Sequence, residues 1–177
     1  FKTWLGWTTI LAGFGIEYCM ANIYLLPSQP AWNTFLTPVS FFITSVLLGV
    51  MTVPVLLMMD LIFKKSQKIE ESPIHITLVE KSLNWLAITA IVLSIITAIV
   101  VFYQTSLLFS GSPAAKTSLI LLMEIYQPLF IMRLILMFCG AGWLGATSIQ
   151  FNQGKIQVEH LLQHVFTACL FVLVAEI

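Results

Sequence analysis

The sequence has 177 residues, of which 59% are hydrophobic and 9% are charged, whereas an average soluble domain has about 25% charged residues. This composition indicates a protein surrounded by lipid. Eight Lys plus Arg balance eight Asp plus Glu, so the protein lacks the basic surface that nucleic-acid binding requires.

Five apolar runs are long enough to cross a bilayer, whose hydrocarbon core of about 30 Å needs about 20 helical residues. Uninterrupted apolar runs exclude barrel strands, so the predicted fold class is an all-α polytopic transmembrane helix bundle. The sequence begins without Met and stops at VLVAEI, with no polar flank. We therefore expect a single membrane domain, 1–177, that is part of a longer protein. The predicted helices cover about 4–25, 39–63, 83–107, 117–149 and 157–177.

The first predicted helix carries Glu17, eight residues before its outer end, on the same face as Ala21 and Tyr24. At helical rise this carboxyl lies about 12 Å deep. An ionisable group inside a membrane is costly, so Glu17 is a candidate functional residue.

The first connection reads ANIYLLPSQPAWNTFLTPVSFF and contains prolines and aromatic residues but no charge. Its prolines are expected to end one helix and start the next. Its aromatic residues are typical of a membrane interface, where one edge of a ring is in contact with water.

The second connection, FKKSQKIEESPIHITLVEKS, carries four lysines. The positive-inside rule places it, residues 64–82, in the cytoplasm. Alternation then places loop 26–38 on the outer face, and Lys116 is the one basic loop residue that disagrees. We interpret the charged run as a solvated loop, which could also meet anionic headgroups.

The fourth predicted helix places Arg133 near its middle, where the charge needs an anion, a polar cavity or water. Tyr126 shares the face of Arg133, whereas Glu124 points to the opposite side, and Pro128 between them is expected to kink the helix. We therefore favour Glu17 as the partner of Arg133. The pair could lock two helices together or take part in proton or quinone chemistry. Further along, CGAGWLGATS supplies small residues that permit close helix packing.

The last predicted helix places His160 and His164 on one face, with Gln157 extending the stripe. This spacing could bind a metal, but it lacks a third ligand, so we favour an interfacial polar stripe with no metal. Two histidines on one helix are also poor evidence for haem. The three cysteines lie in apolar runs without C-x-x-C spacing, so we interpret them as packing residues. They are Cys19, Cys139 and Cys169.

The order of features around the first connection resembles the membrane anchor subunit of anaerobic dimethyl sulfoxide reductase. In IYLLPSQPAWNTFLTPVSFFITSVLLG the family pattern is a Tyr, a proline shortly before a tryptophan, then Thr-Pro and two phenylalanines. YQPLFIMRLILMF looks like the family's span with a central Arg, and VLVAEI looks like the start of its closing signature. The matching residues of the first connection are Tyr24, Pro30, Trp32, Thr37, Pro38, Phe41 and Phe42.

The resemblance implies that the five spans correspond to the last five of eight helices in a bacterial inner membrane protein. It implies a subunit that binds and oxidises menaquinol and passes electrons to an iron–sulfur subunit and a molybdopterin catalytic subunit. It implies no haem, iron–sulfur cluster or molybdenum in this subunit. The family's quinol-linked histidine and acidic residues belong to the earlier helices, so no catalytic residue is carried over.

Two groups of candidate residues remain in this sequence. The candidates for a quinol pocket or its support are Glu17, Tyr24, Tyr126 and Arg133. The candidates for docking the iron–sulfur subunit are Trp32, Asn33 and Phe35. Two alternatives stay open: a transporter or proton-coupled channel that uses the buried Glu17 and Arg133, and a purely structural anchor.

Overall fold

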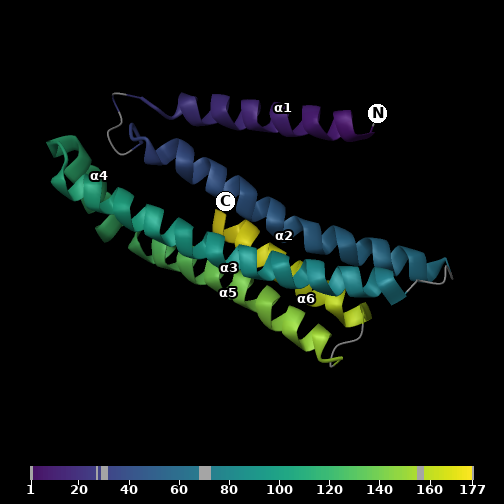
Figure 1. Cartoon of the computed structure of the whole chain (residues 1–177). Coiled ribbons are helices and arrows are strands. Elements are labelled where there is room, and N and C mark those ends of the chain that lie inside the picture. Colours follow the sequence, from purple (N-terminus) through teal and green to yellow (C-terminus); the bar gives the residue numbers. More distant parts are fainter. Residues whose placement is uncertain (1, 27, 29–31, 68–72, 155–157, 177) are drawn as a thin grey trace. The chain divides into compact units, whose positions relative to one another are not determined.

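The computed structural model describes all residues except 1, 27, 29–31, 68–72, 155–157 and 177. The described residues form helices and connecting turns with no strand, which confirms the all-α fold class. Figure 1 labels the helices in sequence order. They are α1 (Lys2–Ile23), α2 (Leu36–Ser66), α3 (Pro73–Ser110), α4 (Pro113–Glu124), α5 (Gln127–Asn152) and α6 (Val158–Glu176).

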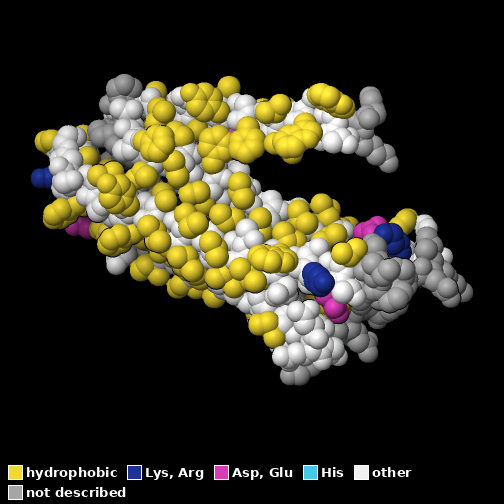
Figure 2. Space-filling model, viewed as in Figure 1, with side chains coloured by type: hydrophobic (Ala, Val, Ile, Leu, Met, Phe, Trp, Pro, Cys, Tyr) yellow, Lys and Arg dark blue, Asp and Glu magenta, His cyan; other side chains and the backbone are white. Residues whose placement is uncertain are grey.

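Among the described residues, three helices are long and apolar enough to cross a membrane: Leu36–Lys64 in α2, Thr77–Ser110 in α3, and α5. A helix satisfies its own backbone hydrogen bonds, as hydrocarbon surroundings require. In α6 the apolar part is shorter, His160–Glu176. On the face shown in Figure 2, hydrophobic side chains cover most of the surface and charged ones are few.

The protein forms two compact units. The first comprises Phe1–Thr44 and Ile99–Gln127, and the second comprises Ser45–Ala98 and Pro128–Ile177. Helices α2 and α3 each contribute residues to both units, while α1 and α4 belong to the first and α6 belongs to the second. The two units are described separately below.

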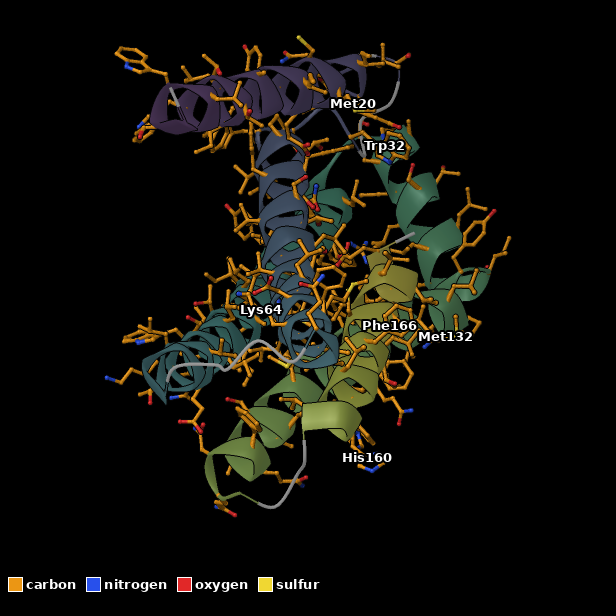
Figure 3. The ribbon with its side chains drawn as sticks, turned by 90° about the vertical axis from the view of Figure 1, so that its right-hand side faces the viewer. Met20, Trp32, Lys64, Met132, His160 and Phe166 are labelled. Atoms are coloured by element: carbon orange, nitrogen blue, oxygen red, sulfur yellow. The ribbon has the colours of Figure 1, made fainter. Side chains whose placement is uncertain are left out.

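The second unit is a bundle of α2, α3, α5 and α6 around one apolar core. Each helix contributes side chains at spacings of three, four or seven residues, which places them on one helical face. On α3, for example, this face includes Val79, Leu83, Ala87 and Ala90. The largest fully buried side chains include Leu47, Met51, Met58, Leu83, Met137, Leu144, Leu161, Val165 and Val172. Met132 on α5 and Phe166 on α6, labelled in Figure 3, are exposed instead.

Gly140 is the point where α5 packs against the backbone of α6. A Cβ atom placed on Gly140 would lie 2.8 Å from the Ala168 carbonyl oxygen and 2.6 Å from Cγ2 of Val172. Gly142, two residues further on α5, has nothing within 4 Å of the same position. Close packing through a small residue is therefore confirmed at Gly140, but it does not extend to Gly142.

The structure differs from the predicted helix 117–149, which it divides into α4 and α5. Helix α4 ends at Glu124, and the amides of Ile125 and Tyr126 both bond to the Leu121 carbonyl oxygen, at 3.0 and 3.1 Å. Pro128 follows in the first turn of α5. The N–H groups of a first turn have no partner within the helix, so the N–H that proline lacks costs no hydrogen bond there. The proline that was expected to kink one helix instead lies at the start of a new one.

The connection between α2 and α3 is shorter than the predicted loop 64–82. Helix α2 continues to Ser66 and α3 begins at Pro73. The added turns of α3 are stabilised because Val79 joins the core of the second unit one turn before Leu83. The part of the predicted connection from residue 73 to 82 is therefore helical, whereas the run predicted to be a solvated loop, KKSQKIEES (64–72), lies partly in the last turn of α2 and partly outside the described residues.

Candidate functional site

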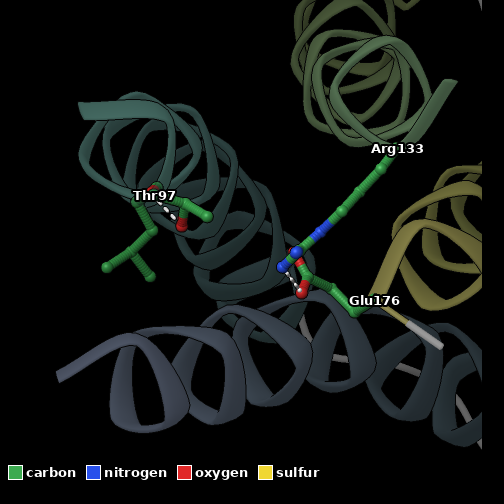
Figure 4. Close-up of polar contacts among 4 residues, drawn as sticks. Thr97, Arg133 and Glu176 are labelled. Carbon is green, nitrogen blue, oxygen red and sulfur yellow. Dashed lines mark hydrogen bonds and ion pairs between the residues drawn. The ribbon is translucent and has the colours of Figure 1, made fainter. Parts of the chain in front are cut away.

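Arg133 on α5 forms an ion pair with Glu176 on α6, within the second unit (Figure 4). Nη2 of Arg133 donates to Oε2 of Glu176 at 2.7 Å. This length is typical of a charge-assisted hydrogen bond between a guanidinium and a carboxylate. The sequence pattern favoured Glu17 as the partner, so that expectation is corrected: the carboxylate that contacts Arg133 is that of Glu176.

The two members of the pair differ in their exposure. The side chain of Glu176 is 2% exposed, whereas that of Arg133 is 37% exposed. A carboxylate removed from water in this way is costly unless a cation neutralises it. Arg133 therefore stabilises the buried charge of Glu176, while its own side chain stays partly exposed.

The guanidinium of Arg133 has donors to spare. It carries five N–H donors in a planar fork, and within the described part of the protein its hydrogen bond is the one to Glu176. Arg133 is thus the one member of the pair whose side chain is available to another molecule.

A third helix contributes a polar side chain to this region. Thr97 on α3 is buried, and its hydroxyl donates to the carbonyl oxygen of Leu93 at 2.9 Å (Figure 4). A hydroxyl that donates to the backbone still has free lone pairs with which to accept a hydrogen bond. Thr97 is thus a further buried polar residue of the second unit, with a hydrogen bond to the backbone of its own helix.

Arg133 lies closer to a helix end than the sequence predicted. It is six residues after Gln127, the first residue of α5, which is about 9 Å along the helix axis. Tyr126, the neighbouring pocket candidate, is exposed just before α5 begins. Because the helix breaks between α4 and α5, Arg133 lies in the second turn of α5, whereas the sequence predicted a position near the middle of a longer helix.

In the first unit, Tyr24 is the centre of an aromatic cluster. Its ring centroid lies 5.0 Å from that of Trp32 and 5.1 Å from that of Phe41. The Thr37 hydroxyl donates to the Trp32 carbonyl oxygen at 2.6 Å. Trp32 is therefore linked to both helix ends: its ring lies against that of Tyr24, just after α1, and its carbonyl oxygen accepts the hydrogen bond from Thr37 in the first turn of α2. Pro30 lies outside the described residues.

The docking candidates project from this connection. Phe35 is 82% exposed, and Asn33 and Trp32 are also exposed. Glu17 is half-buried on α1, where Ala21, one turn later, is fully buried. The three docking candidates are thus accessible to a partner, while the carboxyl of Glu17 is partly shielded.

The histidine stripe of α6 has one aromatic neighbour. The His164 ring lies 5.9 Å from that of Trp143 on α5, while His160, labelled in Figure 3, is exposed. Among the described residues no group of three or more possible metal ligands comes together, and Gln157 lies outside them. The three cysteines are free; Cys19 and Cys139 are exposed and Cys169 is half-buried, so two of them do not pack in a core of this protein.

Tryptophan–tyrosine pairs recur at similar spacings in the sequence, and one pair lies within a single helix. On α3 the exposed Trp85 and Tyr103 are 18 residues apart, which is about 27 Å of helix. Between them the exposed side chains are mainly Ile and Val. This distance is close to the thickness of the hydrocarbon core, at whose two surfaces Trp and Tyr are enriched. The other pairs, each 17 residues apart, are Trp7 with Tyr24 and Tyr126 with Trp143.

Comparison with known proteins identifies no relative: no family model, no curated protein and no solved structure matches this sequence.

Proposed function

We propose that this protein is the membrane anchor and quinol-oxidising subunit of a dimethyl sulfoxide reductase-type complex. The observation that carries the proposal is the aromatic cluster of the first unit. Tyr24, Trp32, Thr37 and Phe41 are the residues of the family-like segment, and they contact one another through rings and a hydrogen bond. Residues that only marked a membrane interface would have no need of this mutual packing.

In this proposal the protein crosses the bacterial inner membrane five times. Helices α1 and α6 join the three helices that are long and apolar enough to span. The lysine-rich connection between α2 and α3 lies in the cytoplasm, following the positive-inside rule. The tyrosine of each Trp–Tyr pair then marks the outer surface of the hydrocarbon core and the tryptophan marks the inner one, because α1 and α3 run outward and α5 runs inward.

The outer connection is the proposed docking surface for an iron–sulfur subunit. Interfaces are enriched in exposed aromatic residues, which bury a large area when a partner covers them. Trp32, Asn33 and Phe35 lie on this connection, and the packing of Trp32 against Tyr24 restricts the conformation around them. Preorganisation of this kind reduces the entropy lost on binding. Electrons from menaquinol would pass through the iron–sulfur partner to a molybdopterin subunit.

The proposed quinol pocket includes Arg133 in the second unit; Glu17, Tyr24 and Tyr126, which belong to the first unit, remain candidates for a quinol pocket or its support on the sequence alone. Quinol binding needs an apolar slot and a few polar groups that hold its oxygen atoms. The partly exposed guanidinium of Arg133 supports this role, since its unused donors are available to an oxygen atom.

The proposal is tested on the whole complex, expressed with its neighbouring subunits and purified in mild detergent. We expect iron–sulfur absorption to co-purify with this protein, and a menaquinol analogue to drive reduction of an S-oxide. The double variant Trp32→Ala, Phe35→Ala should release the iron–sulfur subunit, while Trp85→Ala, which alters an exposed tryptophan on α3, should not.

The rival function has its own signature. Solute or proton flux through vesicles containing this protein alone, without co-purifying clusters, would refute the anchor and support a transporter. The ion pair gives that rival no advantage, because Glu176 already neutralises Arg133.

A further inference from the structure

Lys81 on α3 is an exposed cation with no carboxylate on its own face of the helix. None of the residues three or four positions away is acidic, and these are the positions that neighbour Lys81 on the helix surface. Glu80 is half-buried and lies about 100° away around the helix. Within the described part of the protein Lys81 forms no ion pair, whereas Lys64, labelled in Figure 3, and Arg133 each bond to a carboxylate. The charge of Lys81 is therefore available to an anion from outside the protein.

Ser82 and Trp85 lie on the same exposed side of α3 as Lys81. Trp85 is 71% exposed and lies about one turn after Lys81, and Ser82 is exposed as well. An ammonium group, a hydroxyl group and an indole N–H all donate hydrogen bonds. The three donors occupy about 6 Å along the helix axis, a length over which the oxygen atoms of one phosphate group can reach all of them.

These donors lie where the charged part of α3 gives way to its uncharged part. No Asp, Glu, Lys or Arg occurs between Ser82 and Ala115, and tryptophan is enriched where hydrocarbon meets the headgroups. Further along α3 the same face continues with exposed apolar side chains: Ile88, Val92 and Ile95. A ligand whose charged group contacts Lys81 therefore has an apolar surface beside it for the rest of its length. This arrangement suits a phospholipid better than a free phosphate ion.

We propose that Lys81, Ser82 and Trp85 form a binding site for the phosphate group of an anionic phospholipid, whose acyl chains lie along the apolar face of α3. The lysine supplies the positive charge and the other two residues supply further donors. A zwitterionic lipid carries a cation beside its phosphate, and Lys81 repels that cation. The site is independent of the proposed function, because it includes none of the residues proposed for quinol binding or for docking a partner.

The test measures lipid selectivity at Trp85 in a full-length variant whose other tryptophans are replaced by phenylalanine. The protein is reconstituted in bilayers of phosphatidylcholine and phosphatidylglycerol in varying proportions, with one of the two lipids brominated in its acyl chains. Quenching of Trp85 fluorescence then gives the ratio of the two lipid-binding constants. We expect the ratio to favour phosphatidylglycerol by about fivefold, which is the effect of one lysine beside an anionic headgroup.

Three variants in this background identify the source of the selectivity. Lys81→Gln should bring the ratio close to one, and Lys81→Arg, which keeps the charge, should preserve it. Lys64→Gln is the matched control, because it removes one positive charge near the end of α2 that precedes α3 and should leave the ratio unchanged. Circular dichroism and size-exclusion chromatography establish that each variant is folded.

Three results would overturn the inference. The first is a ratio that Lys81→Gln leaves unchanged. The second is an equal fall in Lys64→Gln and Lys81→Gln, which would show a general attraction by the positive charges of this end of the protein. The third is loss of the selectivity when millimolar inorganic phosphate is added at constant ionic strength, which would assign the donors to a free phosphate ion.

Discussion

Replacing Gly140 with alanine adds one methyl group where α5 and α6 are closest. The new Cβ would lie 2.8 Å from the Ala168 carbonyl oxygen, whereas ordinary van der Waals contacts begin at 3.4 Å. A carbonyl group in the middle of a helix cannot rotate away, so the two helices have to separate by several tenths of an ångström. Inserting an extra methyl group into a well-packed contact typically costs about 1–3 kcal/mol.

Gly142→Ala is the matched control, because it makes the same chemical change on the same helix where nothing lies within 4 Å. Both variants gain the higher helix propensity of alanine, worth up to about 1 kcal/mol. The difference between the two variants therefore isolates the steric term. We expect Gly140→Ala to be less stable than Gly142→Ala by about 1–3 kcal/mol.

The assay is unfolding of the protein in mixed detergent micelles with increasing sodium dodecyl sulfate, followed by circular dichroism and tryptophan fluorescence. A Gly140→Ala variant as stable as Gly142→Ala would show that α5 and α6 do not pack at this distance. A parallel change, Ala168→Gly, should not rescue Gly140→Ala, since the obstructing atom is a backbone oxygen.

Three further predictions concern single contacts. Arg133→Gln should lower the free energy of unfolding by about 3 kcal/mol, because it removes the guanidinium that bonds to the buried Glu176 carboxylate, and adding Glu176→Gln should recover most of the loss in the same micelle assay. Thr37→Val should cost about 1 kcal/mol by removing the hydroxyl donor to the Trp32 carbonyl, and faster amide hydrogen exchange in the connection would reveal it. In a variant that retains only Trp85, lipids brominated near the headgroup should quench fluorescence more than lipids brominated at the end of the acyl tail; the reverse order would contradict an interfacial position.

The fold class could be predicted from the sequence because a long apolar run in hydrocarbon must satisfy its own backbone hydrogen bonds, and a helix does so. The helix ends could not. The turns from Pro73 to Ser82 carry charges, a pattern typical of a loop, yet Val79 packs into the core of the second unit and keeps them helical. Conversely, the sequence around Pro128 was predicted to continue one helix, and the break depends on the backbone hydrogen bond of Tyr126, which the pattern of apolar residues does not reveal.

Only one member of the ion pair could be predicted. A cation in an apolar run draws attention wherever it occurs, so Arg133 was identified directly. Its partner was not, because helical spacing relates residues within one helix, whereas Glu176 is 43 positions away on α6. Both Glu17 and Glu176 lie in apolar runs, and only the packing of α5 on α6 distinguishes between them. The aromatic residues of the first connection were recognised by their order, but their mutual contacts came from the structure.

The separation of Arg133 and Glu176 in the sequence has a consequence for biogenesis. A ribosome synthesises α5 before α6, so Arg133 reaches the insertion machinery before its counterion exists. A lone arginine at the centre of an inserting helix adds about 2.5–3.5 kcal/mol to the insertion free energy, and less nearer to an end. We expect α5 to insert poorly when α6 is absent, and the two to enter the membrane efficiently as a hairpin whose charges cancel.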